Sequence, residues 1–317
     1  MCNYFPQTGS RLKMKQQVMK KETRNAYIAL ALVSFFWGTT YIASRIGAQQ
    51  MPGLFMAGLR QFLSGLILVS FFLIKGYKIP SWQVLKRISV QGIFLLCIAN
   101  GLLTWSVEYI SGGLAAIIAA LVPLFIALFT VWLSKCARIT RSMLIGLGIG
   151  LAGVVTIFYD YLGQLQSKSF ILGVVLALLS VLSWSFGTVY TAKQKPKIEI
   201  LFSVGLQMLI AGILMLIICG ITGKYINLAT AGHTSLWALS YLIVFGSLLA
   251  YSAYVFAISK LPPTQVSIYA YINPIVAVVL GWLLLAEKMN MVMLLGMLIT
   301  LSGVYIVNHE SKKLKHE

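Results

Sequence analysis

Long stretches of apolar residues, separated by short polar segments, run along this 317-residue chain. Each stretch holds about 20 residues, the length that an α-helix needs to cross the hydrocarbon core of a bilayer. Backbone groups in lipid must be satisfied within the segment, so helix is the expected state of each stretch. The pattern predicts ten transmembrane helices, at residues 26–47, 53–74, 87–107, 112–134, 142–159, 170–191, 199–221, 236–259, 264–285 and 291–308.

The sequence contains two copies of one pattern, roughly 150 residues apart. Gly38-Thr39-Thr40-Tyr41-Ile42-Ala43 returns as Gly187-Thr188-Val189-Tyr190-Thr191-Ala192, and Pro123-Leu124 returns as Pro274-Ile275. Each copy holds five predicted spans, so the second copy must lie upside down relative to the first. Inverted repeats are typical of secondary transporters. We therefore predict an all-α polytopic membrane protein with a basic tail at 1–25, five-helix repeats at 26–159 and 170–308, and a second tail at 309–317.

Composition and charge support lipid as the solvent. Only 10% of the residues are charged, whereas a soluble domain carries roughly 25%. Of the 25 Lys and Arg residues, 20 fall in the tails and loops on one side of the predicted spans, three fall on the other side, and Arg45 and Arg60 lie within spans. This asymmetry predicts cytoplasmic termini in a plasma (cell inner) membrane. It also explains the net charge of +18 without a nucleic-acid partner.

The first 25 residues precede an uncleaved first helix in this interpretation, and Met14 or Met19 would serve as a start as well as Met1. The chain carries little that could support catalysis. It has three His, all in a predicted loop or the C-terminal tail, and no pair of its four Cys has metal-ligand spacing. We find no metal-protease motif, paired carboxylates or phosphate-binding loop. We therefore expect neither an enzyme nor a cofactor or metal site.

Polar and aromatic side chains within the spans are the candidate lining of a substrate cavity, because such groups are costly in lipid and tend to face a cavity. Simple helix packing is the alternative for the residues of spans 1, 6 and 9, and interfacial anchoring is the alternative for Tyr251 of span 8. The predicted cavity residues are Trp37, Thr39, Tyr41, Arg60, Asn100, Trp184, Thr188, Tyr190, Tyr251, Tyr271 and Asn273.

The sequence gives a more specific prediction for two prolines and one arginine within these spans. Pro123 and Pro274 remove a backbone donor in mid-span and are predicted hinges, with a packing kink as the alternative. Arg60 requires a partner, which is either a substrate carboxylate or a fixed group of the protein. Its counterpart in the second copy is Gln207, so the two halves are not equivalent.

Carboxylates and glycines complete the pattern. Glu108 and Glu287 fall near span ends and are expected to act as interface anchors, while Glu287 has capping or pairing with Lys288 as an alternative. Gly146, Gly150 and Gly153 share one face of the fifth span, and small residues let helices approach closely in lipid. That face predicts packing within the bundle or a homodimer interface.

Several motifs together resemble the EamA-type members of the drug/metabolite transporter superfamily. They are Trp37-Gly38, Arg60, Gly113-Leu114-Ala115-Ala116 before Pro123, Leu261-Pro262-Pro263, Val266-Ser267, Asn273-Pro274 and Glu287. The resemblance implies ten helices in a 5+5 inverted repeat and a central cavity lined mainly by helices 1, 3, 4, 6, 8 and 9. It also implies export or exchange of small metabolites such as amino acids.

We therefore expect a secondary transporter that moves small metabolites, amino acids above all, across the plasma membrane by alternating access. Its partners would be a small-molecule substrate and the lipid bilayer. A transporter of nucleotide sugars or lipid-linked intermediates is an alternative, but a phosphorylated substrate would require several buried cations. A non-transporting membrane scaffold is a second alternative, and it would bind ligands without flux.

Overall fold

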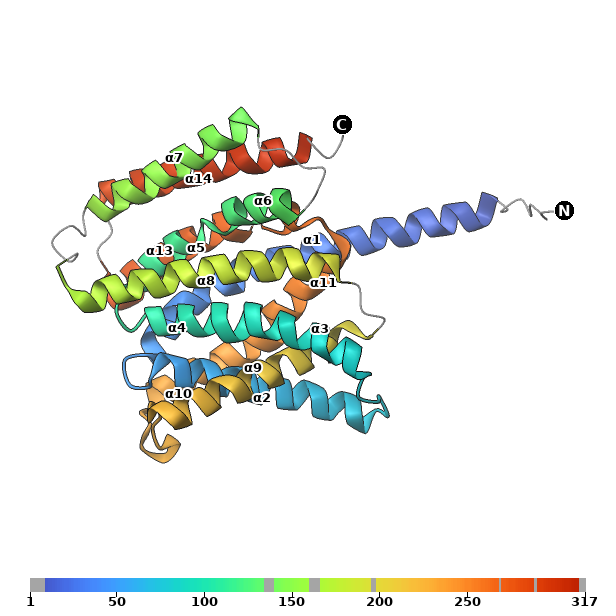
Figure 1. Ribbon diagram of the computed structural model, residues 1–317, viewed down its shortest axis with the longest axis horizontal. Helices are drawn as coiled ribbons and strands as arrows, with labels where there is room; N and C mark the ends of the chain where they lie inside the picture. The colour runs from blue at the N-terminus through green and yellow to red at the C-terminus, as the bar shows by residue number, and fades with distance from the viewer. Residues whose placement is uncertain are drawn as a thin grey trace.

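The computed structural model describes residues 9–133, 140–159, 166–194, 198–267, 269–287 and 290–313. Within these ranges it also describes the side chains, except at residues 9–21, 154, 157–159, 230, 264, 271, 308 and 311–313. The described part of the chain is helical and contains no strand, as the apolar pattern predicts (Figure 1). The start of α1 and the end of α14 lie at the same end of the bundle.

The first half of the chain folds into the helices that correspond to predicted spans 1 to 5. They are α1 (Gly9–Gly47), α2 (Gly53–Ile74), α3 (Trp82–Gly92), the π-helix η1 (Ile93–Asn100), α4 (Gly101–Ser106), α5 (Gly112–Ala119), α6 (Val122–Leu133) and α7 (Arg141–Tyr159).

The second half repeats this order. Its helices are α8 (Lys168–Lys193), α9 (Ile200–Thr222), the 3-10 turn η3 (Leu228–Thr230), α10 (His233–Tyr241), the π-helix η4 (Leu242–Tyr251), α11 (Ser252–Lys260), α12 (Pro263–Val266), α13 (Tyr269–Leu285) and α14 (Met291–Lys313).

Seven helical segments of the described residues are long and apolar enough to cross a membrane. They are Glu22–Gly47, Gly53–Ile74, Trp82–Ser106, Gly112–Leu133, Lys168–Lys193, Ile200–Thr222 and His233–Lys260. The predicted fifth, ninth and tenth spans correspond to the shorter apolar helices Arg141–Gly153, Ile272–Leu285 and Met291–Val307. These lengths and this composition make the chain a multi-pass membrane protein.

Corresponding helices of the two copies pack on each other. α2 lies along α9, and α7 lies along α14 at the edge of the bundle (Figure 1). A Cβ at Gly153 would lie 2.6 Å from the Gly296 carbonyl, and a Cβ at Gly303 would lie 2.6 Å from the Gly150 Cα. The glycine face of the fifth span is therefore used for packing within the chain.

The third span of each copy contains a π-helix, η1 in the first and η4 in the second. A π-helix is rare and often occurs at functional sites. Asn100 ends η1 and Tyr251 ends η4, so the two copies place different polar side chains at equivalent points. The apolar pattern does not distinguish π from α geometry, so the sequence gives no sign of these segments.

The fourth span of the first copy was predicted as one helix, 112–134, with a hinge at Pro123. In the structure it is two helices, since α5 ends at Ala119 and α6 begins at Val122. Proline is favoured in the first turn of a helix, because a backbone N–H at that point would have no intrahelical acceptor. The chain is thus interrupted just before Pro123, whereas Pro274 lies inside α13.

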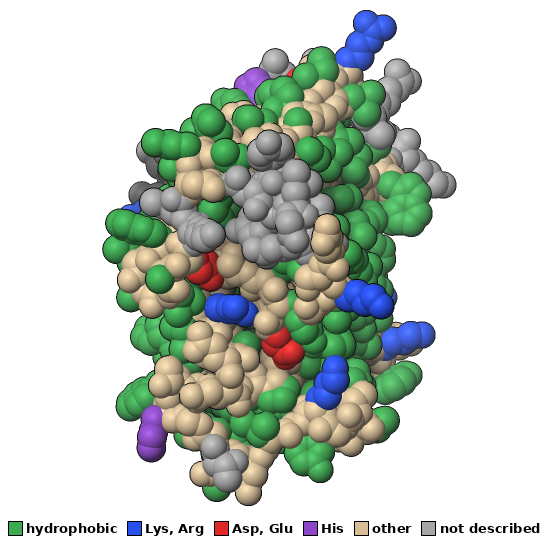
Figure 2. Space-filling view, turned by 90° about the vertical axis from the view of Figure 1, so that its left-hand side faces the viewer, with side chains coloured by type: hydrophobic (Ala, Val, Ile, Leu, Met, Phe, Trp, Pro, Cys, Tyr) green, Lys and Arg blue, Asp and Glu red, His purple; other side chains and the backbone are tan. Residues whose placement is uncertain are grey.

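The outer surface of the bundle carries many large apolar side chains, among them Ile74, Trp132 and Ile221, which are at least 73% exposed. Figure 2 shows hydrophobic side chains on the flanks of the end that faces away from the start of α1, with acidic side chains near its centre. Exposed apolar flanks are the surface expected of a protein surrounded by lipid.

Candidate functional site

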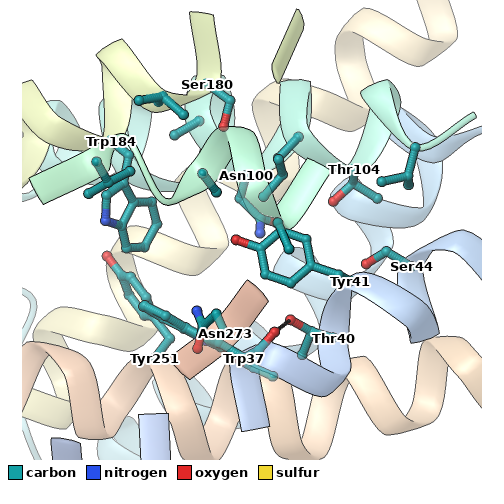
Figure 3. A pocket seen from close by; sticks show the side chains of 18 of the residues that line it. Trp37, Thr40, Tyr41, Ser44, Asn100, Thr104, Ser180, Trp184, Tyr251 and Asn273 are labelled. Carbon is teal, nitrogen blue, oxygen red and sulfur yellow. Dashed lines mark hydrogen bonds between the residues drawn. The ribbon is translucent and has the colours of Figure 1, made fainter. Parts of the chain in front are cut away.

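A cavity lies within the bundle and is lined by residues of both copies. The first copy contributes residues from α1, α2, η1, α4, α5 and α6, and the second from α8, η4 and α13. Its polar and aromatic lining is Trp37, Thr40, Tyr41, Ser44, Arg60, Gln61, Asn100, Thr104, Ser180, Trp184, Tyr251, Tyr269 and Asn273. All of these except Arg60, Gln61 and Tyr269 are labelled in Figure 3. An apolar and aromatic lining with a few polar groups is typical of sites for small organic ligands.

Five aromatic side chains form one contiguous group at this cavity, which we call the aromatic cluster: Trp37, Trp184, Tyr251, Tyr254 and Tyr269. The ring of Trp37 lies 5.2 Å from Trp184, 5.0 Å from Tyr254 and 5.0 Å from Tyr269, measured between centroids. The contacts with Trp184 and Tyr269 are edge-to-face and the contact with Tyr254 is tilted, and such aromatic pairs favour defined ring positions. The cluster therefore offers a rigid aromatic surface built by α1, α8, η4, α11 and α13.

Trp37 is fixed at its polar edge as well. Its indole Nε1 donates a hydrogen bond of 3.2 Å to the Gly246 carbonyl, which belongs to η4. Gly246 also lies against Arg60, since a Cβ at this glycine would be 2.8 Å from Nη2 of Arg60. One residue of the π-helix thus places the tryptophan and the arginine of the cavity next to each other.

Arg60 is 4% exposed and lines the cavity. Its Nε donates a hydrogen bond of 2.7 Å to the hydroxyl of Ser247. The next residue, Gln61, donates from its amide to Oδ1 of Asn100 at 3.1 Å, while its own Oε1 is buried and has no donor among the described residues. Arg60 is the only charged side chain in the described lining of the cavity.

Asn273 joins α13 to α1 beside the cavity. With its amide oriented to satisfy both neighbours, its nitrogen donates to the Ser34 carbonyl at 2.8 Å and to the Tyr269 carbonyl at 3.1 Å. The residue that follows is Pro274, which cannot donate from its backbone. Asn273 therefore lines the cavity and also holds the first turns of α13 against α1.

Seven of the predicted cavity residues come together in the cavity: Trp37, Tyr41, Arg60, Asn100, Trp184, Tyr251 and Asn273. Tyr271 lies on α13, but its side chain is outside the part that the structure describes. The structure places the remaining three away from the described lining.

Thr39 and Thr188 each make a hydrogen bond of 2.6 Å to a tyrosine hydroxyl, that of Tyr241 and that of Tyr254, respectively. Tyr190 stacks on Phe186 near the end of α8, with 6.4 Å between ring centroids. Successive residues of an α-helix are rotated by about 100° around its axis, so the repeated motif cannot place all of its members on one face. Thr188 acts from behind the cavity, where it holds a member of the aromatic cluster.

Gln61, Thr40 and Tyr269 line the cavity but were not predicted to do so. Gln61 is a polar residue in the middle of an apolar span, directly after Arg60, and this was the available signal. Thr40 is the neighbour of Thr39 in the repeated motif. Which of two adjacent threonines faces the cavity depends on the rotation of α1, which the sequence does not specify.

The two glutamates near span ends act as caps. The carboxylate of Glu108 accepts a hydrogen bond from the backbone N–H of Gly53 at the start of α2. Glu287 accepts from the N–H groups of Gly112 and Gly113 at the start of α5, at 2.9 and 3.1 Å. A carboxylate at a helix N-terminus satisfies free donors and interacts well with the helix dipole. Burial raises the pKa of Glu108, although Gly53 and Lys224 act in the opposite direction.

The site contains no described group of three His, Cys, Asp or Glu side chains that could hold a metal ion. Its chemistry is that of recognition, with aromatic faces, amides, hydroxyls and one guanidinium.

Comparisons with known proteins give the same family in both halves of the chain. The EamA-like transporter family matches residues 24–159 and again residues 171–309. The chain is 33% identical over 282 residues to the uncharacterized inner membrane transporter YedA of Escherichia coli (strain K12), covering 88% of this chain and 89% of that protein. It is 27% identical to the uncharacterized transporter YvbV of Bacillus subtilis (strain 168), covering 93% and 94% of the two chains.

A chloroplastic WAT1-related protein of Arabidopsis thaliana is 27% identical over 86% of this chain and 67% of its own. Among solved structures, one crystal structure at 17% identity matches with a TM-score of 0.64 and covers 92% of this chain and 99% of its own. At that identity the match concerns the fold alone.

Proposed function

Because this chain belongs to the EamA-like transporter family, we propose that it is a secondary transporter that exports small metabolites, amino acids or related compounds, across the plasma membrane by alternating access. The observation that carries this proposal is the cavity between the two copies. Its lining comes from both halves, so relative motion of the halves would change which side of the membrane it faces.

The proposal includes ten spans in a 5+5 inverted repeat. Support comes from the equivalent pairs α2 with α9 and α7 with α14, and from the π-helix in the third span of each copy. The charge asymmetry of the loops supports cytoplasmic termini. In this arrangement the end of the bundle that holds Glu108 and Glu287 faces the outside.

Polar contacts between the two copies exist at each end of the bundle. At one end Glu287, which follows α13, binds the start of α5. At the other end Lys260 of α11 pairs with Glu22 of α1 at 3.1 Å. Alternating access requires contacts of this kind to open at one end while those at the other end stay closed. The ion pair of Lys260 and Glu22 is partly exposed to solvent, and exposed ion pairs contribute little to stability.

An amino acid fits the chemistry of the cavity. The aromatic cluster provides an apolar surface and π-faces that attract an ammonium group. The unpaired Oε1 of Gln61 is an acceptor, and Tyr41 and Asn100 add polar groups that could orient a ligand. A phosphorylated substrate fits less well, because Arg60 is the only cation in the described lining.

The decisive experiment is flux in proteoliposomes. Purified protein is reconstituted, and exit of radiolabelled L-phenylalanine, L-leucine and L-threonine is compared with that from protein-free vesicles. A cell-based screen of metabolites in the medium then extends the search to other classes, with the Trp184→Ala variant as the inactive comparison. Specific flux that Trp184→Ala abolishes is the expected result. Ligand binding without flux of any labelled compound would indicate the non-transporting scaffold instead.

A further inference from the structure

The guanidinium of Arg60 is a buried positive charge that the described part of the chain binds at one end alone. Nε is bound by Ser247, but neither Nη atom has a hydrogen-bond acceptor among the described residues. Gly246 packs against Nη2 without offering a side chain. The group is thus held at Nε, while its two terminal nitrogens are available at the cavity.

No carboxylate of the described chain lies within 4.0 Å of this guanidinium. The chain has only seven acidic residues, and five of them belong to its described part. Glu22 pairs with Lys260, and Glu108, Glu199 and Glu287 accept backbone hydrogen bonds at the N-termini of α2, α9 and α5. Glu310 lies in the last turns of α14, and Asp160 and Glu317 lie outside the described residues.

The second copy shows that the bundle does not need a charge at this point. Gln207, the counterpart of Arg60, is 1% exposed and is satisfied by protein groups alone. Its amide nitrogen donates to Gln91 at 3.0 Å, and its oxygen accepts from the Tyr251 hydroxyl at 2.5 Å. A neutral amide therefore fills this position of the repeat without a ligand.

A buried charge in a membrane protein is costly unless it is paired, and such charges usually mark a substrate or ion pathway. The partner that best matches a guanidinium is a carboxylate, which accepts two parallel hydrogen bonds from its terminal nitrogens. A single cation balances a single negative charge. Because Gly246 contacts both Arg60 and Trp37, the apolar part of a ligand bound at Arg60 would lie near the aromatic cluster.

We propose that Arg60 binds the carboxylate of the transported molecule, so that the substrates are small monocarboxylates, amino acids included, with an apolar body. This assignment rests on the proposed transport function of the same cavity. It excludes amines and neutral solutes as the preferred cargo. A phosphate ester is likewise excluded, since its second charge would have no partner in the described lining.

Wild-type protein alone provides the first test. Quenching of tryptophan fluorescence in detergent reports ligands beside Trp37 and Trp184, and the probes are 3-phenylpropanoate, its neutral analogue 3-phenylpropanamide, L-phenylalanine and phenethylamine. The two carboxylates should bind at least about tenfold more tightly than the amide and the amine, as expected for a charge-assisted contact. Equal affinity of acid and amide, or no binding of either carboxylate, overturns the proposal.

Variants of Arg60 test whether this side chain causes the preference for carboxylates. Arg60→Gln should lose the preference for acid over amide, and Arg60→Lys should keep part of it, because lysine retains the charge but not the planar fork. Arg45→Gln is the matched control: Arg45 donates to the carbonyls of Val107 and Glu108 and does not line the cavity. If Arg60→Gln folds and keeps the full preference, Arg60 is not the carboxylate site.

Separate measurements of binding and of flux distinguish a failure of this proposal from a failure of the proposed transport function. If carboxylates bind selectively through Arg60 but no flux occurs in proteoliposomes, the carboxylate site is supported and the proposed transport function is contradicted. If flux occurs with no preference for acids over amides, the transport function is supported and the carboxylate site is contradicted.

Discussion

The carboxylate of Glu287 accepts a hydrogen bond of 3.1 Å from the backbone N–H of Gly113. Its second oxygen accepts from Gly112, so both contacts join the segment after α13 to the first turn of α5. The two residues are 174 positions apart in the chain. A cap that usually belongs to one helix and its own flanking residue is here supplied by the other half of the molecule.

Replacing Glu287 by Ala should lower the free energy of unfolding by about 1 kcal/mol, because two free N–H groups at the start of α5 lose their acceptor. The measurement is unfolding by SDS in mixed micelles. Glu287→Gln keeps an acceptor oxygen and should lose less. Equal stability of wild type and Glu287→Ala would show that water replaces the cap.

The glycine face of α7 gives a second prediction. A Cβ at Gly153 would meet the backbone nitrogen and hydroxyl of Thr300, whereas a Cβ at Gly148 would meet nothing within 4 Å. Gly153→Ala should therefore destabilise the α7–α14 pair by about 1–3 kcal/mol, as overpacking does. Gly148→Ala on the same helix is the control and should be neutral. A tolerated Gly153→Ala would mean that the two helices are not held at this separation.

The raised pKa of Glu108 predicts that the stability of the protein depends on pH. Burial raises its pKa in the folded protein, so the folded state binds the proton more tightly than the unfolded state. Its contribution to stability is complete below the unfolded pKa of about 4.3 and is lost as the pH rises through the raised folded value. Wild type should lose thermal stability relative to Glu108→Gln over this range. Parallel curves for the two proteins would exclude the effect.

Much of the helix layout could be predicted from the sequence because lipid imposes a simple rule. The predicted span 53–74 coincides with α2, Gly53–Ile74, and the other apolar stretches also became helices. A hinge or kink was predicted at Pro123, but the interruption between Ala119 and Val122 was not. Hydropathy measures apolar content, and it is insensitive to a backbone that changes from α to π or stops for two residues.

The cavity was predicted in part. Trp37, Arg60 and Asn100 line it, as large polar or aromatic residues in lipid-crossing segments are expected to do. Thr39 and Tyr190 belong to the same repeated motif but do not line it among the described residues. Repetition in a sequence identifies equivalent positions, whereas the face that each position presents depends on how its helix is rotated in the bundle.

Thr188 shows how such a residue can still matter to the site. Its single hydroxyl proton goes to the Trp184 carbonyl at 2.8 Å, so the contact of 2.6 Å with Tyr254 is one in which the tyrosine donates. Tyr254 is fully buried and lies within 5.2 Å of the Trp184 ring. Thr188 therefore fixes a member of the aromatic cluster from outside the cavity.

A double-mutant cycle tests this role. Thr188→Val and Tyr254→Phe each remove one side of the bond, and the coupling between them should be about 0.6 kcal/mol, with an upper limit near 1.7 kcal/mol. Because the Tyr254 ring would then be less constrained, the tryptophan emission should also change in Thr188→Val, whereas Thr222→Val, on an exposed turn of α9, should leave it unchanged. Additive energies and an unaltered spectrum would show that ring packing alone positions Tyr254, and the aromatic surface offered to a ligand would then not depend on the repeated threonine.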